Sequence, residues 1–332
     1  RMYGRELLQG IALFSRTQTN WVLLHQEMLI DAGLPEWLQA SGVNGVIARV
    51  HLHTIAALKR LNVPVVDVLC HHQFEDMPRV ETDDKKVAEL AFEHLWDRGF
   101  RRFAYCGFSG AHYSENRLRF FRERISSTDA SLSVYTTPTG PDNRLTTVEQ
   151  SWLIDAQPVA DWLKTLEPPT GLFVCNDIRG QQVLNACRAL ELSVPDDIGV
   201  IGVDDDDTIC SLSDPPLSSV KPDATLVGYR AAEVLREMME GRLDSYGTEY
   251  ISPRGVVARM STEVDAIDDR EVAHVCRYIR QHACDGIDVN DLLQITPLSR
   301  RQLERRFRQV FDRTLHEEIT RVQVNKVKQL LK

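Results

Sequence analysis

Short polar side chains follow two apolar runs of the chain at the point where each run ends. Asp204 comes directly after Gly199–Val203, and Asn176 and Asp177 come directly after Gly171–Cys175. If both runs are parallel strands, these residues meet at the edge of a sheet where α/β proteins bind small ligands. Carboxylates and amides bond in pairs with neighbouring hydroxyls, as a sugar site requires. Capping of the backbone that follows is the alternative, and it explains at least one of Asn176 and Asp177.

Other patterns that could indicate a metal or a nucleotide are not supported. The four carboxylates of Asp204–Asp207 are adjacent, so they cannot all face one ion, and no partner cluster is visible. His51 and His53 have no third ligand at a suitable spacing. Gly107–Gly110 does not fit the G-x-G-x-x-G pattern of dinucleotide sites. We therefore predict no metal and no cofactor and, since no nucleophile motif is found, no enzyme.

Length and composition are those of an ordinary globular protein. The 332 residues suffice for two domains, and 43% apolar with 26% charged residues is typical of folded chains. No apolar run approaches the ~18–20 residues of a transmembrane helix, and the first residues do not resemble a signal peptide. Seven scattered cysteines without a C-x-x-C pair indicate neither disulfides nor zinc. We expect a cytoplasmic protein that does not contact a membrane.

Charge is distributed unevenly along the chain. Residues 269–332 carry 13 Lys and Arg against 9 Asp and Glu, a net charge of +4, although the whole chain has a net charge of −9. The preceding 268 residues therefore carry −13. An acidic body with a basic tail indicates that only the tail meets a polyanion, although a solvated basic face would look the same.

The first 262 residues alternate apolar runs with amphipathic stretches, which predicts an α/β domain of one or two doubly wound parallel sheets. The strand candidates are Trp21–His25, Gly45–Val50, Val63–Cys70, Phe103–Phe108, Leu132–Thr137, Gly171–Cys175 and Gly199–Val203. The helix candidates include Tyr3–Phe14, Asp84–Arg98 and Arg179–Leu190. Because no strand precedes the first of these helices, we expect a first strand to be missing from this sequence.

A polar stretch, Ala258–Asp269, separates this domain from a helical tail. We predict domains at residues 1–262 and 271–332, joined by a linker at 263–270. Within the tail, Asp288 is placed to cap a short helix, and Ser299 with Gln302 forms a capping box for the next one. A long last helix begins at about His316.

Several short motifs of the large domain occur in a characteristic order. They are Val80–Asp84, Ala91–Gly99, Arg117–Phe121, Gly171–Asp177, Val194–Asp205 and Pro215–Asp223. This order resembles the effector-binding domain of the lac and galactose repressor family, whose two-lobed fold is shared with type I periplasmic sugar-binding proteins. The resemblance implies a monosaccharide bound between the lobes and a homodimer formed through this domain. A transport-type sugar-binding protein has the same fold, but it would have an export signal and no DNA module.

The tail resembles the first half of an arabinose-regulator-type DNA-binding module. Asp288–Phe311 carries the likeness, mainly through Ser299–Phe307. That module has two helix-turn-helix units joined by a long helix, and this chain ends within the joining helix. The combination of sensor and reader implies a transcription regulator acting on double-stranded operator DNA. It favours D-xylose as the effector, with a non-sugar small molecule as the alternative.

The resemblance also assigns further residues of the sugar site. Beside Asp204, which its place at the strand end makes a ligand contact, it gives Asn176 as a contact and Asp177 as a structural residue. It adds Asp83, which a helix N-cap would also explain, and Arg117. In its charge-rich helix, Arg117 would otherwise belong to a solvated face. The last residue is Trp152, which either stacks on the sugar ring or packs in the core.

Two stripes divide the predicted helix Arg300–Phe311. Leu303, Phe307 and Val310 form an apolar stripe that faces the core of the small domain. The outward stripe consists of Arg301, Glu304, Arg305 and Arg308. On a recognition helix, Arg301 or Arg305 would bind a guanine and Glu304 a cytosine amino group, while Arg300 and Arg308 would contact phosphates. A helical bundle with an arginine-rich surface is the alternative.

Overall fold

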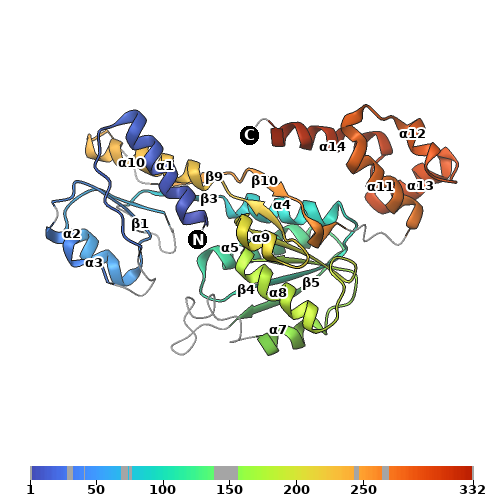
Figure 1. Ribbon diagram of the computed structural model, residues 1–332, viewed down its shortest axis with the longest axis horizontal. Coiled ribbons are helices and arrows are strands. Elements are labelled where there is room, and N and C mark those ends of the chain that lie inside the picture. Colours follow the sequence, from blue (N-terminus) through green and yellow to red (C-terminus); the bar gives the residue numbers. More distant parts are fainter. Residues whose placement is uncertain are drawn as a thin grey trace.

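The computed structural model describes residues 2–27, 33–40, 42–68, 74, 77–137, 156–242, 247–263 and 269–330. They form two α/β lobes and a helical domain (Figure 1). The first lobe is mainly blue but includes α10 and β9 in yellow to orange, and the helical domain lies at the red end of the colour bar. Among the described helices, none is long and apolar enough to cross a membrane.

The first lobe is built on a parallel sheet with the strand order β1-β2-β3-β9. Its strands are β1 (Val46–Ala48), β2 (Val65–Asp67), β3 (Arg79–Thr82) and β9 (Thr248–Ile251). Its helices are α1 (Met2–Gln18), α2 (Glu36–Ala40), α3 (Leu52–Arg60) and α10 (Ala224–Met239). Leu7, Phe14 and Val227 of the two long helices pack on Val66 and Val80 of the sheet, so α1 and α10 cover one face together.

Helices α1 and α10 approach each other at two glycines. A Cβ atom on Gly10 would lie 1.9 Å from the carbonyl oxygen of Thr225, and one on Gly228 would lie 1.9 Å from that of Leu7. No side chain fits at either position, so both glycines permit backbone-to-backbone packing of these helices.

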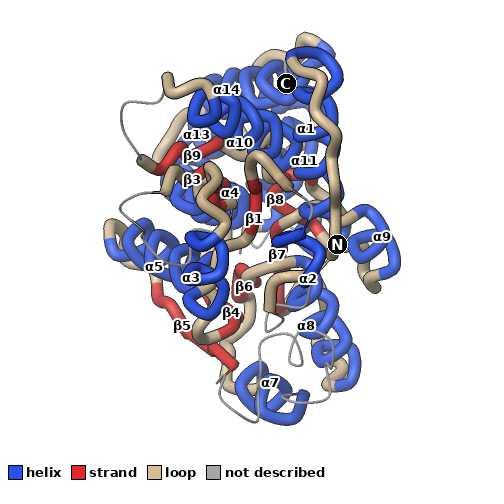
Figure 2. Tube along the Cα trace, turned by 90° about the vertical axis from the view of Figure 1, so that its left-hand side faces the viewer, coloured by secondary structure: helices blue, strands red, loops and turns tan. Residues whose placement is uncertain are grey.

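The second lobe is built on a sheet with the strand order β10-β8-β7-β6-β4-β5, parallel except for β10. Its strands are β4 (Arg102–Phe108), β5 (Ser131–Thr137), β6 (Thr170–Val174), β7 (Ile198–Val203), β8 (Ser218–Lys221) and β10 (Gly255–Val257). Its helices are α4 (Asp84–Trp96), α5 (His112–Ser126), α7 (Ala156–Leu163), α8 (Asp177–Ala189) and α9 (Asp207–Leu212). Because α4 and α5 pack on one face and α7 to α9 on the other, the strands run between two helix layers (Figure 2).

The chain passes between the two sheets three times, after β3, after β8 and after β9. Where β3 leads into α4, the N–H of Asp83 donates to the carbonyl oxygen of Ile251, 2.8 Å away, at the end of β9. Two of the three passages therefore touch each other at the start of α4. Two sheets with three crossings confirm the expected two-lobed α/β fold.

The helical domain consists of α11 (Arg270–His282), α12 (Val289–Gln294), α13 (Arg300–Phe311) and α14 (Leu315–Leu330). Two 3-10 turns, Met260–Thr262 and Ala283–Asp285, lie before α11 and after it. The domain has its own core, which includes Val275, Ile279, Leu292, Leu303 and Phe307. Residues 264–268 of the expected linker are outside the described part of the chain.

Most expected elements occur within a few residues of their expected bounds, but Trp21–His25 is not a strand. Trp21 packs its ring against Phe14, with ring centroids 5.7 Å apart, and its carbonyl oxygen accepts from the Ser15 hydroxyl. In the described part of the chain, the next residues pair with no strand, and Val22 is 87% exposed. The apolar run therefore anchors a loop to α1 and does not extend the sheet.

Candidate functional site

The loop after β7 has an unusual backbone. Asp204 and Asp205 have φ values of +113° and +51°, in the left-handed region that non-glycine residues rarely adopt. The N–H of Asp204 donates to the carbonyl oxygen of Val220, 3.0 Å away on β8. Backbone conformations of this kind persist only where surrounding contacts fix them, and they occur preferentially at ligand sites.

Arg117 lies at the centre of the candidate site. Its side chain is buried, with Nε donating to Asp84 Oδ1 at 2.8 Å and Nη1 donating to the carbonyl oxygen of Cys175 at 2.5 Å. Burial alone would lower the pKa of Arg117, but the carboxylates of Asp84 and Asp204 outweigh it, so that this pKa is raised. The solvated-face alternative is therefore wrong for Arg117, because its guanidinium joins α5 to α4 and to the end of β6.

Asp83 and Asn176 both cap helices. The Asp83 carboxylate accepts from the N–H of Lys86 at 3.0 Å, and Asn176 Oδ1 accepts from the N–H of Arg179 at 2.9 Å. The amide nitrogen of Asn176 also donates to the hydroxyl of Tyr113 at 3.2 Å. Capping is thus present at both residues, and it fixes each side chain beside the end of a parallel strand.

Asp177 is buried within the second lobe. It accepts from the hydroxyl of Ser219 at 2.6 Å and from the N–H of Asp206 at 2.8 Å. Burial and the charge of Asp204 raise the pKa of Asp177. These contacts agree with the structural role expected for it. Trp152 lies outside the described residues.

Tyr3 was not found by the sequence analysis. Its hydroxyl shares a 3.1 Å hydrogen bond with the hydroxyl of Thr82, at the end of β3. Loss of water around the phenol raises the pKa of Tyr3 to about 12, and the charges of Arg49, Asp204 and Arg117 also act on it. Tyr3 is therefore close to the candidate site. It lies in the first turn of α1, outside the recognised motifs, so the sequence held no signal for it.

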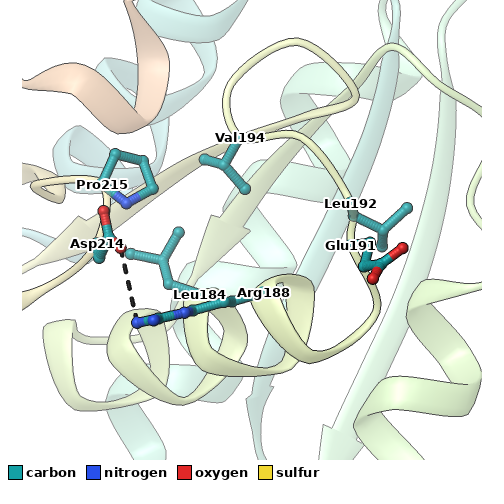
Figure 3. A pocket seen from close by; sticks show the side chains of 7 residues that line it. All are labelled: Leu184, Arg188, Glu191, Leu192, Val194, Asp214 and Pro215. Atoms are coloured by element: carbon teal, nitrogen blue, oxygen red, sulfur yellow. Dashed lines mark ion pairs between the residues drawn. The ribbon is translucent and has the colours of Figure 1, made fainter.

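A shallow pocket occurs elsewhere on the second lobe (Figure 3). Its lining residues are Leu184, Arg188, Glu191, Leu192, Val194, Asp214 and Pro215. Arg188 and Asp214 form a 3.7 Å ion pair there, but both side chains are more than 70% exposed. The pocket lies beside the amino ends of β7 and β8, whereas ligands of parallel sheets bind at the carboxyl ends. It is therefore separate from the candidate site.

The carboxylates of the acidic run after β7 bind different partners. The carboxylate of Asp205 binds Lys221 and Arg259, Asp206 caps the N–H of Ile209, and the hydroxyl of Ser211 donates to Asp207. Among the described residues, no group of three or more His, Cys, Asp and Glu could hold a metal ion.

Helix α13 presents the two expected stripes. Leu303, Phe307 and Phe311 are buried and Val310 is half-buried. The predicted DNA-contacting side chains are all exposed: Arg300, Arg301, Glu304, Arg305 and Arg308. Arg300 and Glu304 form a 2.9 Å ion pair on this surface, and such exposed pairs contribute little to stability.

The expected cap at Asp288 and the expected capping box of Ser299 and Gln302 are both present, and Asp291 turns the Asp288 cap into a second capping box. The N–H of Ser299 donates to Gln302 Oε1 at 3.0 Å, and the N–H of Asp288 donates to Asp291 Oδ2 at 2.8 Å. The chain turns between Gln294, where α12 ends, and Arg300, where α13 begins. The exposed stripe of α13 is directed away from the core of the helical domain.

Comparison with known proteins gives a family. A model of the periplasmic binding protein-like domain matches residues 92–262. The xylose operon regulatory protein of Escherichia coli (strain K12) is 32% identical, with 100% of this chain and 84% of that protein covered. The protein of the same name from Haemophilus influenzae is 28% identical, with coverages of 100% and 86%.

Solved structures agree with this. The xylose-binding transcription activator xylR matches with a TM-score of 0.69 and 29% identity, covering 100% of this chain and 85% of that one. A LacI-family regulator from Enterococcus faecium with bound ribose matches with a TM-score of 0.64 and 20% identity, covering 80% and 95%. The latter likeness shows the fold alone.

The two-lobed fold, the polar side chains at the ends of its strands and these relatives define a sugar-responsive transcription regulator with a periplasmic-binding-protein-like domain. More particularly, the chain belongs to the family of the xylose operon regulatory proteins.

Proposed function

We propose that this chain binds D-xylose between its lobes and thereby controls the binding of its helical domain to operator DNA. The observation that carries the proposal is the convergence on Arg117 of strand ends from both sheets. Asp84 comes from the start of α4, after β3, Cys175 follows β6, and the charge of Asp204 comes from the end of β7. Asp83, Asn176 and Trp152 complete the proposed sugar contacts.

The charges of the site favour a neutral ligand. Arg117 already pairs with Asp84, and the carboxylates of Asp83 and Asp204 lie at the same strand ends. Carboxylates accept hydrogen bonds from hydroxyl groups but repel phosphate or carboxylate groups. A free monosaccharide therefore suits these groups better than a sugar phosphate. Relatives described as regulating a xylose operon or as xylose-binding support D-xylose in particular.

The helical domain is proposed to be the first helix-turn-helix unit of an arabinose-regulator-type module. The domains would be residues 1–262 and 271–332, with the linker at 263–270. In this arrangement α13 enters the major groove of the operator with Arg301, Glu304 and Arg305, while Arg300 and Arg308 contact phosphates. Because such a unit also contacts the phosphate backbone, we expect its DNA binding to be salt-sensitive.

The protein is also proposed to be a cytoplasmic homodimer without enzyme activity. Operators with two half-sites suit a two-fold regulator, and the dimer would form through the effector domain. Light scattering at micromolar concentration tests this, since a monomeric mass both with and without sugar would contradict it.

The ligand is tested by isothermal titration of the chain with D-xylose, L-arabinose, D-ribose and D-glucose, alongside an assay for sugar turnover. We expect saturable heat with D-xylose, weaker binding of the other sugars and no turnover. Absence of heat with every sugar would contradict the proposed function, and tighter binding of another sugar would contradict the choice of xylose.

A further inference from the structure

The left-handed backbone of Asp204 and Asp205 must be held by contacts outside the loop itself. Two side chains, those of Ser219 and Asp177, accept hydrogen bonds from its backbone. The N–H of Asp205 donates to the hydroxyl of Ser219 at 3.0 Å, and the N–H of Asp206 donates to Asp177 at 2.8 Å. These bonds hold amide groups of the loop, and the side chain of Asp205 adds a further attachment.

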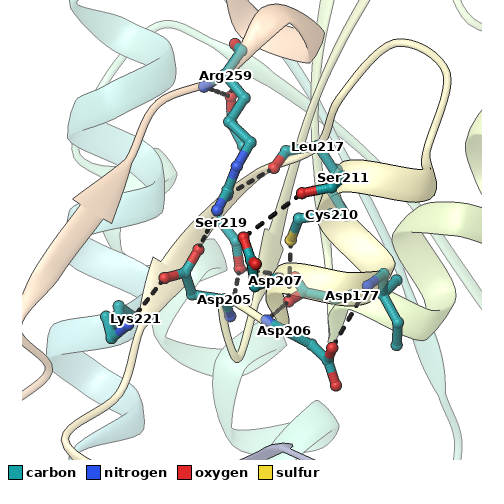
Figure 4. A network of polar contacts seen from close by, with 12 residues as sticks. Asp177, Asp205, Asp206, Asp207, Cys210, Ser211, Leu217, Ser219, Lys221 and Arg259 are labelled. Atoms are coloured by element: carbon teal, nitrogen blue, oxygen red, sulfur yellow. Dashed lines mark hydrogen bonds and ion pairs between the residues drawn. The ribbon is translucent and has the colours of Figure 1, made fainter.

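The carboxylate of Asp205 is only 7% exposed and is held by two cations (Figure 4). Arg259 Nη2 donates to Oδ1 at 2.7 Å, and Lys221 Nζ donates to Oδ2 at 3.1 Å. Lys221 is 27% exposed, whereas Arg259 is 18% exposed. Since a guanidinium binds with a fixed geometry and an ammonium does not, Arg259 defines the direction of this carboxylate.

Arg259 is itself held by hydrogen bonds of its side chain, of its backbone and of a neighbouring residue. Its Nη1 donates to the carbonyl oxygen of Leu217 at 3.0 Å, and its N–H donates to the hydroxyl of Ser218 at 2.8 Å. Two residues later, Ser261 donates to the carbonyl oxygen of Val200 at 2.6 Å, within β7. The guanidinium therefore reaches the loop from a segment that is bonded to the same strand from which the loop emerges.

We propose that Asp205 and Arg259 are positioning residues of the sugar site. Their ion pair holds the Asp204–Asp205 backbone in its left-handed conformation, which keeps the Asp204 carboxylate near Arg117. Neither residue contacts the sugar in this proposal; both act through Asp204. The inference rests on the proposed function and deepens it by naming what preorganises the sugar-binding carboxylate.

The first test measures the dissociation constant for D-xylose by calorimetry in three variants. Loss of a bond to a charged group should weaken binding, and we expect about tenfold for Arg259→Ala. Arg259→Lys keeps the charge but loses the planar fork that donates to Leu217 and Asp205, so it should recover only part of the affinity. Arg254→Ala is the matched control, because Arg254 lies on the same returning segment but pairs with Asp223. It should bind like the wild type.

The second test separates positioning from a general structural role. In an Asp204→Ala background, adding Arg259→Ala should weaken xylose binding no further, because Arg259 acts through Asp204. Additive losses would overturn the proposal. Asp205→Gly should also bind xylose more tightly than Asp205→Ala, since glycine adopts a φ of +51° without strain. Equal or reversed affinities would count against it.

Failure of the two proposals can be told apart. If the wild-type chain binds none of the sugars, the proposed function and the positioning role both fall. If the wild type binds a sugar and Arg259→Ala, folded by circular dichroism, binds it equally well, only the positioning role falls. If Arg259→Ala does not fold, the comparison of Arg259→Lys with the wild type decides in the same way.

Discussion

At the scale of single residues, the account depends most on Asp204. Replacement of Asp204 by alanine should reduce the free energy of D-xylose binding by roughly 1.5–3 kcal/mol, typical of hydrogen bonds to a charged group. Asp207→Ala, three residues along the same acidic run and exposed, is the matched control. Calorimetry checks both. Wild-type affinity in Asp204→Ala would mean that this residue serves only to shape the loop.

Arg305 tests the DNA surface at the same scale. Arg305→Ala should cost ~1–3 kcal/mol at the specific operator and relax the preference at one base position. Arg308→Ala, predicted to remove a phosphate contact, should weaken binding to all sequences alike and reduce its salt dependence. Footprinting titrations of the full-length protein measure both. Unchanged base preference in Arg301→Ala, Glu304→Ala and Arg305→Ala would show that α13 does not read bases.

The residues of the site differ in how far the sequence could reveal them. Asp204 and Asn176 could be proposed as site residues because each follows an apolar run, and such a run predicts a strand. The burial of Arg117 could not be predicted, because its partner Asp84 lies 33 positions away and its own helix is rich in charge. The place of Tyr3 could not be predicted either, because its hydrogen-bond partner Thr82 is 79 positions away.

At the scale of elements, the packing of α1 on α10 leads to a stability prediction. Gly228→Ala would place a Cβ atom 1.9 Å from the Leu7 carbonyl oxygen, so the helices must separate. We expect a loss of ~1–3 kcal/mol in stability, as for other overpacked sites. Gly4→Ala in α1 is the control, since nothing lies within 4 Å of the added atom. Thermal denaturation of both variants measures this. If Gly228→Ala is no less stable than Gly4→Ala, the close packing of α1 on α10 is wrong.

Near the end of α4, buried His94 leads to a pH prediction. It shares a 2.7 Å hydrogen bond with Thr262, and burial, together with the charges of Arg98 and Arg280, lowers the pKa of His94 well below 6.5. Because the unfolded chain then binds the proton more readily, this contribution to stability is present above pH 6.5 and is lost as the pH falls below it.

The loss from His94 should amount to about 1 kcal/mol between pH 6.5 and 5.5. Urea unfolding of the wild type and of His94→Gln at both pH values measures it, with the variant expected to have the smaller pH dependence. His316→Gln, at an exposed position, is the control for loss of an imidazole. Identical pH dependence in the wild type and His94→Gln would contradict the assignment.

Elements defined by local signals were predicted better than those defined by distant ones. The capping residues Asp288 and Ser299 fixed the starts of α12 and α13, because a cap is decided within four residues. Strands β3 and β9 are four residues each and pair with each other across more than 160 positions. Such short strands depend on their neighbours in the sheet, and no local pattern marks them.

At the scale of the whole molecule, the helical domain is docked on the second lobe through charged side chains. Asp97, at the end of α4, accepts from Arg313 at 2.9 Å and from Arg321. Arg101 donates to the carbonyl oxygen of Val310, 2.7 Å away at the end of α13. The helix that starts beside the proposed sugar contacts thus ends against the domain proposed to bind DNA.

The central claim is that a sugar controls DNA binding. It is tested most directly by anisotropy titrations of the full-length protein against duplex DNA that the protein itself has selected from a random pool. Titrations with and without D-xylose should differ in affinity by about fivefold or more, as coupled sites do. In the same titrations, the DNA affinity of Asp204→Ala should be equal with and without D-xylose, at the sugar concentration used for the wild type. Equal DNA affinity of the wild type in both conditions, with xylose bound, would contradict the account.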